Sequence, residues 1–288
     1  MGTVESDGFI LVRNGQKKRR NRNKNVKSPA TFSTTEDSEN DKLDHIAFRD
    51  KLAKDREALT DSNFSRNFLR SLTQEPVSGQ SGNTSAGQIQ CLVSYGIGHV
   101  GTSRIARIQY AHFLIIRDFL RESLGVKVRA FLFDPVLTPD EKAAIEADDV
   151  TIIPENEECR RCVENEESLT FFYMPHCDRP MYENLLWANW RPDLLSRVVF
   201  FGNSFWLIGE RVPSSRLKEE TPLLAKSVKR ECFEEKTIDV DSSIDDDVFN
   251  DCALTWFPKD TLLPIKEEEA EFWEKSSIPI SCTPAELR

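Results

Sequence analysis

The sequence predicts an α/β fold in which a Rossmann-like, mostly parallel sheet has helices on both faces, preceded by N-terminal helices and a disordered basic tail. Two observations lead to this prediction. Short segments rich in Val, Ile and Phe alternate with helical segments from residue 89 to residue 208, and parallel strands need such crossover connections. The chain also has 288 residues, 39% of them hydrophobic, which is enough to form one large or two small domains.

Strands are predicted where the apolar runs are short and rich in β-branched or aromatic residues. These runs lie at residues 89–95, 127–133, 150–153, 169–174, 197–201 and 253–257. Helices are predicted between them at 102–124, 137–147 and 179–190, and a short acidic helix at 266–275. In the first of these helices, apolar residues and His112 recur at spacings of three and four. This periodicity places His112 on the core-facing side, where we expect a hydrogen-bonded core residue.

Composition divides the chain into three parts. Residues 1–40 contain eight basic and no acidic residues between Arg13 and Lys27 and are followed by a Ser/Thr/Asn-rich stretch, so we expect a disordered basic tail. Residues 41–88 hold two amphipathic helices and then a Gly/Ser-rich linker at 74–88. Residues 89–288 form the α/β domain, with a polar, acidic insertion or loose helix at about 214–247.

Charge and cysteine content restrict the compartment and the partners. No run approaches the length of a spanning helix, and Glu5 and Asp7 precede any apolar segment, so neither a membrane partner nor a signal peptide is predicted. Seven cysteines are an odd number and favour reduced thiols in the cytoplasm. The run Lys17-Lys18-Arg19-Arg20 is typical of a nuclear address or a nucleic-acid contact, and a solvated basic tail is the alternative. Outside this tail, nucleic acid is not an expected partner.

The first strand is followed by a Gly-x-Gly-x-x-Gly motif. It comprises Gly96, Gly98 and Gly101, and glycines there allow positive φ and close approach of a ligand to the backbone. Asp134 ends the second strand, where nucleotide-binding folds place an acid on the ribose. Asp134 lies 33 residues beyond Gly101, further than the usual spacing of about 20. A structural turn with tightly packed glycines is therefore the alternative to a nucleotide-like ligand.

Polar residues follow the later strands as well. In an open α/β sheet, ligands bind outside the carboxyl ends of the strands, so we expect these ends to surround one crevice. The residues predicted to line it are Tyr95, Gly96, Gly98, Asp134, His176, Asn184, Asn203 and Ser204. The alternative is that loops are polar in any protein.

No residue set identifies a catalytic centre, a metal site or a cofactor. His176 and Cys177 are adjacent, so their side chains should point in opposite directions and not form a nucleophile and base. Cys159 and Cys162 have C-x-x-C spacing, but no second pair completes a zinc site. We interpret them as an ordinary pair of thiols.

Five segments together resemble the sensitivity-to-red-light-reduced (SRR-like) domain family. They are Tyr95-Gly96-Ile97-Gly98, Phe133-Asp134-Pro135, the run from Phe172 to Cys177, the run from Tyr182 to Trp190, and Gly202-Asn203-Ser204-Phe205. The resemblance covers about residues 89–211. It implies a regulator of circadian-clock input with a link to haem biosynthesis, and it carries over no catalytic residue.

The leading hypothesis is a regulatory protein that binds a small ligand at the crevice. One rival is an adenosylmethionine-dependent methyltransferase, since that class uses a glycine loop after the first strand and an acid after the second. Another is a non-catalytic scaffold. From Glu219 to Arg288 the chain has 8 basic and 18 acidic residues, and this acidic C-terminal part would then recruit a protein partner.

Overall fold

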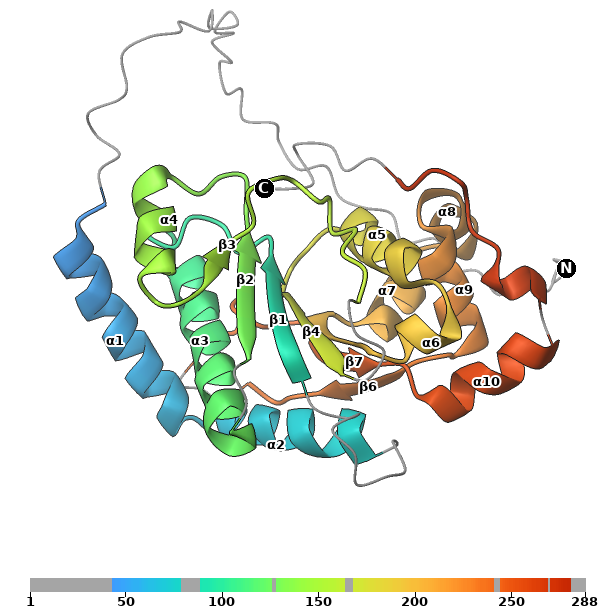
Figure 1. The fold of residues 1–288 in the computed structure, drawn as a ribbon, viewed down its shortest axis with the longest axis horizontal. Helices are drawn as coiled ribbons and strands as arrows, with labels where there is room; N and C mark the ends of the chain where they lie inside the picture. Colours follow the sequence, from blue (N-terminus) through green and yellow to red (C-terminus); the bar gives the residue numbers. More distant parts are fainter. Residues whose placement is uncertain are drawn as a thin grey trace, which may run out of the picture. The chain divides into compact units, whose positions relative to one another are not determined.

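A seven-stranded sheet forms the centre of the described part of the chain (Figure 1). The computed structural model describes residues 43–78, 89–125, 128–163, 168–240, 244–268 and 270–280. The strands are β1 (Ile89–Tyr95), β2 (Arg129–Phe133), β3 (Thr151–Ile152), β4 (Leu169–Met174), β5 (Val198–Asn203), β6 (Glu234–Thr237) and β7 (Cys252–Trp256). Their order in the sheet is β3-β2-β1-β4-β5-β7-β6. The first five are parallel, while β7 and β6 are antiparallel to their neighbours, so the predicted mostly parallel sheet is confirmed.

The crossover helices begin and end close to the predicted positions. Helix α3 (Arg104–Leu124) joins β1 to β2, α4 (Pro139–Glu146) joins β2 to β3, and α5 (Arg179–Asn189) with α6 (Pro192–Leu195) joins β4 to β5. Ser103 caps α3 by accepting a hydrogen bond from the Ala106 N–H, and Gly125 ends it with a φ of 60°. Thr138 and Glu141 form a capping box at α4. These local signals explain why the sequence locates the helices well.

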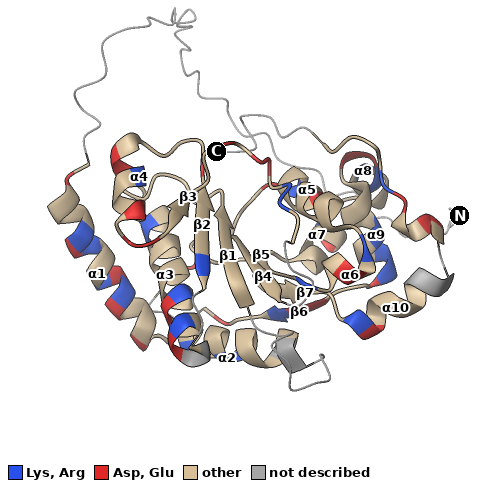
Figure 2. Ribbon diagram, in the orientation of Figure 1, with Lys and Arg blue, Asp and Glu red and all other residues tan. Residues whose placement is uncertain are grey.

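Both faces of the sheet are covered, as predicted. Successive strand residues point to opposite faces, so Leu92 and Phe171 belong to one buried apolar cluster, with residues of the N-terminal helices and α3. Val93 and Phe172 belong to the other, with residues of α5 and α9. The central strands β1, β4 and β5 carry no charged residue, as Figure 2 shows. Such continuous apolar strands are typical of a sheet buried on both faces.

Two helices precede the sheet, as the sequence predicts. They are α1 (His45–Asp61) and α2 (Asn63–Ser78). Ion pairs from Arg107 to Asp55 and from Arg56 to Asp118 join α1 to α3. The linker predicted from residue 74 is wrong in its first part, because α2 continues through Pro76 to Ser78. Its remainder, at 79–88, and the basic tail predicted for residues 1–40 lie outside the described residues.

His112 is a core residue, as its periodicity predicts. Its side chain is fully buried, and Nδ1 lies 3.3 Å from the hydroxyl of Tyr173. Phe64, Phe68 and Phe249 contact the ring at centroid distances of 5.0, 4.6 and 5.1 Å. Burial lowers the pKa of His112 to about 3, so the imidazole is neutral in the folded chain at physiological pH.

The C-terminal part is more regular than the composition suggests. It contains α7 (Phe205–Arg211), α8 (Ser214–Glu220), α9 (Pro222–Arg230), α10 (Lys259–Glu268) and the 3-10 turn η2 (Ala270–Trp273). The segment 214–247, expected as a polar insertion or loose helix, supplies α8, α9 and the edge strand β6. The helix expected at 266–275 is divided between α10 and η2. Within the described ranges, no helix is both long and apolar enough to cross a membrane.

Candidate functional site

The glycine loop after β1 is hydrogen-bonded by the protein itself. Gly96 and Gly98 have φ values of +69° and +78°, which non-glycine residues rarely adopt. The N–H of Gly98 donates to Asp134 Oδ2 at 2.7 Å, and that of Gly101 donates to Glu141 Oε1 at 2.8 Å. Both carboxylates are 2% exposed. The donors that would bind a phosphate therefore already bind buried acids of this chain.

Asp134 connects the ends of two neighbouring strands. Its second oxygen, Oδ1, accepts a hydrogen bond from the Val136 N–H at 3.0 Å. Burial raises the pKa of Asp134, while the bonds from Val136 and Gly98 oppose this rise. Because both oxygens accept backbone hydrogen bonds, the carboxylate stabilises the loop, and the geometry favours the structural alternative for this motif.

Cys177 and Met181 pack beside Gly96 in the crevice between β1 and β4. The strand order reverses there, which is where ligands bind in doubly wound sheets. A Cβ atom at Gly96 would lie 2.9 Å from Cys177 Sγ and 3.4 Å from the terminal methyl of Met181. The Cys177 thiol donates to the carbonyl oxygen of Tyr95 at 3.4 Å. Two cavities lined by described residues lie further along this edge, beside the ends of β4 and β5.

His176, Cys177 and Asn203 form a hydrogen-bonded unit at the ends of β4 and β5. The N–H of His176 donates to Asn203 Oδ1 at 3.1 Å, and Asn203 Nδ2 donates to the Cys177 carbonyl oxygen at 2.9 Å. His176 has a φ of +57°, and its Nε2 donates to the carbonyl oxygen of Val248 at 2.9 Å. The imidazole and the Cys177 thiol thus bond to different segments and do not form a nucleophile and base.

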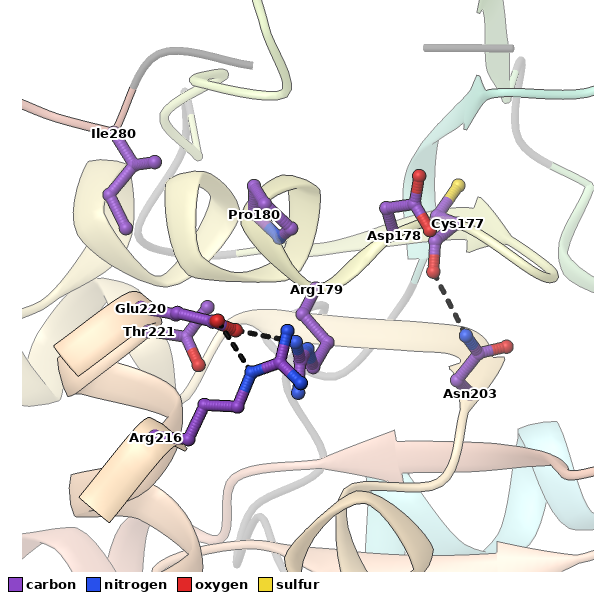
Figure 3. A pocket seen from close by; sticks show the side chains of 9 residues that line it. All are labelled: Cys177, Asp178, Arg179, Pro180, Asn203, Arg216, Glu220, Thr221 and Ile280. Atoms are coloured by element: carbon purple, nitrogen blue, oxygen red, sulfur yellow. Dashed lines mark hydrogen bonds and ion pairs between the residues drawn. The ribbon is translucent and has the colours of Figure 1, made fainter. Parts of the chain in front are cut away.

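A cavity of about 560 Å³ opens beside this unit (Figure 3). It is lined by Cys177, Asp178, Arg179, Pro180, Asn203, Arg216, Glu220, Thr221 and Ile280, and we call it the α5 pocket. A second cavity of about 210 Å³ is lined by His176, Asn203, Ser204, Leu207, Ile208, Arg211, Val212, Asn250 and Asp251. Asn203 lines both cavities.

The structure therefore divides the predicted site residues. His176, Asn203 and Ser204 line cavities, whereas the other five predicted residues line neither of these two. Ser204 also caps α7, where its hydroxyl accepts from the Leu207 N–H and donates to Glu235 Oε2 at 2.7 Å.

Tyr95 and Asn184 hold loops in place. The Tyr95 hydroxyl donates to Glu157 Oε2 at 2.5 Å. Burial, with this bond, raises the pKa of Tyr95. Asn184 is fully buried, and its Nδ2 donates to the carbonyl oxygens of Glu158 at 3.0 Å and Ile280 at 2.8 Å. Asn184 therefore positions Ile280, which lines the α5 pocket.

Sequence reasoning missed the charged residues of the α5 pocket. Arg179 directly follows Asp178, the N-cap residue of α5, which makes no side-chain cap hydrogen bond. The position of Arg179 just after the end of β4 was a usable signal. Arg216 and Glu220 are spaced i, i+4 on α8, a spacing that is common on exposed helices. Among the described cysteines no disulfide is formed, and no cluster of potential ligands in the described ranges could hold a metal ion.

The role of Asp134 leads to a stability prediction. Asp134→Asn keeps one acceptor but places an amide N–H₂ against a backbone N–H, so the free energy of unfolding should fall by about 1–3 kcal/mol. Urea denaturation measures the change. Asp149→Asn, at an exposed residue on a loop with a φ of 56°, is the control and should change stability little. An unchanged stability in Asp134→Asn would show that this carboxylate does not hold the loop.

Comparison with known proteins gives a consistent family. The chain is 39% identical over 158 residues to an SRR1-like protein of Mus musculus, covering 55% of this chain and 59% of the relative. It is 33% identical over 181 residues to the protein Sensitivity to Red Light Reduced 1 of Arabidopsis thaliana, covering 62% and 63%. An SRR1-like protein of Drosophila melanogaster is 31% identical over 169 residues, covering 56% and 54%.

The chain thus spans less than two thirds of the length of each of these relatives. No solved structure matches it significantly. The family model of the SRR1 domain matches residues 32–256, which is more than half of the chain. The matched range includes the ends of β4 and β5, where the two cavities lie. On this match, the chain belongs to the SRR1 domain family.

Proposed function

We propose that the chain is a regulator of circadian-clock input and of haem biosynthesis that acts by binding a small ligand in the α5 pocket. The observation that carries the proposal is the cavity of about 560 Å³ at the carboxyl ends of β4 and β5, the edge where open α/β sheets bind ligands. Similarity to the Arabidopsis protein named for red-light sensitivity supports the regulatory part. The role in haem biosynthesis rests on the family resemblance alone.

Binding is favoured over methyl transfer for a physical reason. A methyltransferase of the usual kind would hold adenosylmethionine against the glycine loop and the acid after β2. Here Gly98 donates to Asp134, and Cys177 contacts the position that a Cβ atom of Gly96 would occupy. A cofactor would have to displace both arrangements. A protein partner for the acidic C-terminal part, and a cytoplasmic and nuclear location, remain further predictions.

Filling the α5 pocket tests the proposal. Ile280→Trp introduces a large ring at a lining residue, whereas Ile278→Trp changes a residue of the same segment that is 75% exposed and outside the lining. Purified chains are screened by thermal shift with adenosylmethionine, nicotinamide and adenine nucleotides, and haem. A ligand at 100 times its Kd adds about 2.7 kcal/mol to stability. We expect a shift in the wild type and Ile278→Trp that is lost in Ile280→Trp.

The cellular experiment uses cells that lack this protein. Wild type and Ile278→Trp should restore rhythm period and haem content, and Ile280→Trp should not. Full restoration by Ile280→Trp, with no ligand raising the melting temperature, would favour the scaffold. Transfer of a labelled methyl group from adenosylmethionine would favour the enzyme.

A further inference from the structure

Three charged side chains meet on one side of the α5 pocket. Arg179 lies in the first turn of α5, and Arg216 and Glu220 lie one turn apart on α8. Arg179 Nη2 donates to Glu220 Oε2 at 2.5 Å, and Arg216 Nε donates to Glu220 Oε1 at 2.6 Å. Figure 3 shows the two guanidinium groups side by side, with dashed lines joining both of them to the Glu220 carboxylate. Guanidinium groups from two separate helices therefore converge on a single anion.

The two arginines keep most of their hydrogen-bond donors. Each guanidinium has five N–H groups. Among the described residues, Glu220 is the acceptor for the side chain of Arg179 and also for that of Arg216. Arg179 is 24% exposed and Arg216 62% exposed at the side chain, so the remaining donors can reach a ligand. The hydrogen bond from Arg216 holds the pKa of Glu220 below its usual range, which shows that the pair already stabilises a negative charge.

We propose that the α5 pocket takes a small molecule with one anionic group, a phosphate or a carboxylate, bound by Arg179 and Arg216. Planar guanidinium groups suit both groups because they donate two parallel hydrogen bonds. Pro180 and Ile280 line the same pocket and provide apolar surface for the rest of the ligand. Asp178, drawn on the Cys177 side in Figure 3, would repel a second anionic group. This inference rests on the proposed function and specifies the ligand class of the same site.

The proposal predicts opposite effects for the two signs of charge. Arg179→Gln with Arg216→Gln should weaken anion binding at least about tenfold, because two charge-assisted contacts are lost. Glu220→Gln should instead tighten it about threefold to tenfold, because the competing carboxylate is removed. If the pocket bound a cation instead, the arginine substitutions would tighten binding and Glu220→Gln would weaken it. A purely structural role would change the melting temperature of the ligand-free chain and leave affinity unchanged.

The probes are phenyl phosphate, benzoate and benzyl alcohol, which share a ring and differ in charge. Calorimetric titration of the full chain should show binding of one or both acids and weaker binding of the alcohol, and the stronger acid identifies the anionic group. Arg191→Gln is the matched control, because Arg191 pairs with Asp193 at side-chain exposures of 62% and 39%, against 62% and 37% for Arg216 and Glu220. It should leave affinity unchanged.

The inference is overturned if neither acid binds better than benzyl alcohol, or if the arginine and Glu220 variants fail to shift affinity in opposite directions. The regulatory proposal is judged separately by Ile280→Trp. If the anion inference is overturned but Ile280→Trp fails to restore rhythm period and haem content, the ligand class is wrong and the pocket retains its role. If Ile280→Trp restores the effect, the proposed function itself fails.

Discussion

Trp190→Ala is expected to lower the free energy of unfolding by about 3–5 kcal/mol. Trp190 is 1% exposed, and its ring lies 5.1 Å from that of Phe272 and 5.5 Å from that of Trp273, centroid to centroid. Its Nε1 donates to the Phe272 carbonyl oxygen at 3.0 Å. Truncation removes this packing and leaves a cavity between α5 and η2. Urea denaturation measures the change.

The same substitution should release the segment after α10. Limited proteolysis is therefore expected to cut near residues 270–280 much faster in Trp190→Ala than in the wild type. Trp190→Phe is the milder comparison, since it keeps one aromatic ring but loses the hydrogen bond and part of the indole packing, and it should cost less than Trp190→Ala. Equal stability of Trp190→Ala and the wild type would mean that this segment does not depend on the indole.

The polar residues of α5 each hold a different part of the chain. Tyr182 donates to the Met174 carbonyl oxygen, and Asn189 Oδ1 accepts from the Val163 N–H. Trp187 Nε1 donates to the Ser276 carbonyl oxygen. The run from Tyr182 to Trp190, which carries much of the family resemblance, therefore has a structural role that does not require catalysis.

The sequence predicts this helix but not its contacts. Local signals are sufficient for its bounds: Pro180 near the start and apolar residues at helical spacing. The partners of Asn184 are 26 and 96 residues away, and only the assembled sheet brings them together. The prediction that Asn184 lines the crevice did not include these two contacts, because an amide on a helix near a strand end can face either a cavity or a buried loop.

The glycine loop shows the same limit. The turn after β1 and its positive φ values follow from the local sequence. The bonds to Gly98 and Gly101 come from residues 36 and 40 positions away, and they depend on the parallel pairing of β1 and β2. Similarly, the polar composition of 214–247 concealed α8 and α9, whose buried residues are Leu217, Leu223, Leu224, Ala225 and Ser227.

Glu183→Ala should be among the most destabilising substitutions, with an expected loss of about 3–5 kcal/mol. Helix α9 starts at Pro222, which has no N–H, and its N-cap Thr221 makes no side-chain cap bond. The N–H groups of Leu223 and Leu224 donate instead to Glu183, at 2.9–3.0 Å. Removing the carboxyl group leaves two buried donors without an acceptor and separates α9 from α5. Chemical denaturation at pH 6 measures the loss.

Glu183→Gln separates the charge from the hydrogen bonds. Burial raises the pKa of Glu183 to about 7 from 4.5, although the bonds from Leu224 and Leu223 and the nearby Lys226 oppose the rise. Between these two values the folded chain keeps a proton that the unfolded chain has released, so this residue lowers stability as pH rises from 4.5 to 7, by roughly 3 kcal/mol in total. Gln cannot ionise, and its amide oxygen can still accept from both N–H groups. The difference in unfolding free energy between Glu183→Gln and the wild type should therefore move in favour of Gln from pH 5 to pH 8.

His112, with its lowered pKa, gives a pH dependence of the opposite sign, but it is common to both chains and cancels in the difference. Glu234→Gln, at an exposed residue of β6, is the control for replacing a glutamate elsewhere in the chain. A difference that stays constant with pH would mean that Glu183 is already ionised at pH 5 in the folded chain, and that the two backbone bonds outweigh the cost of its burial.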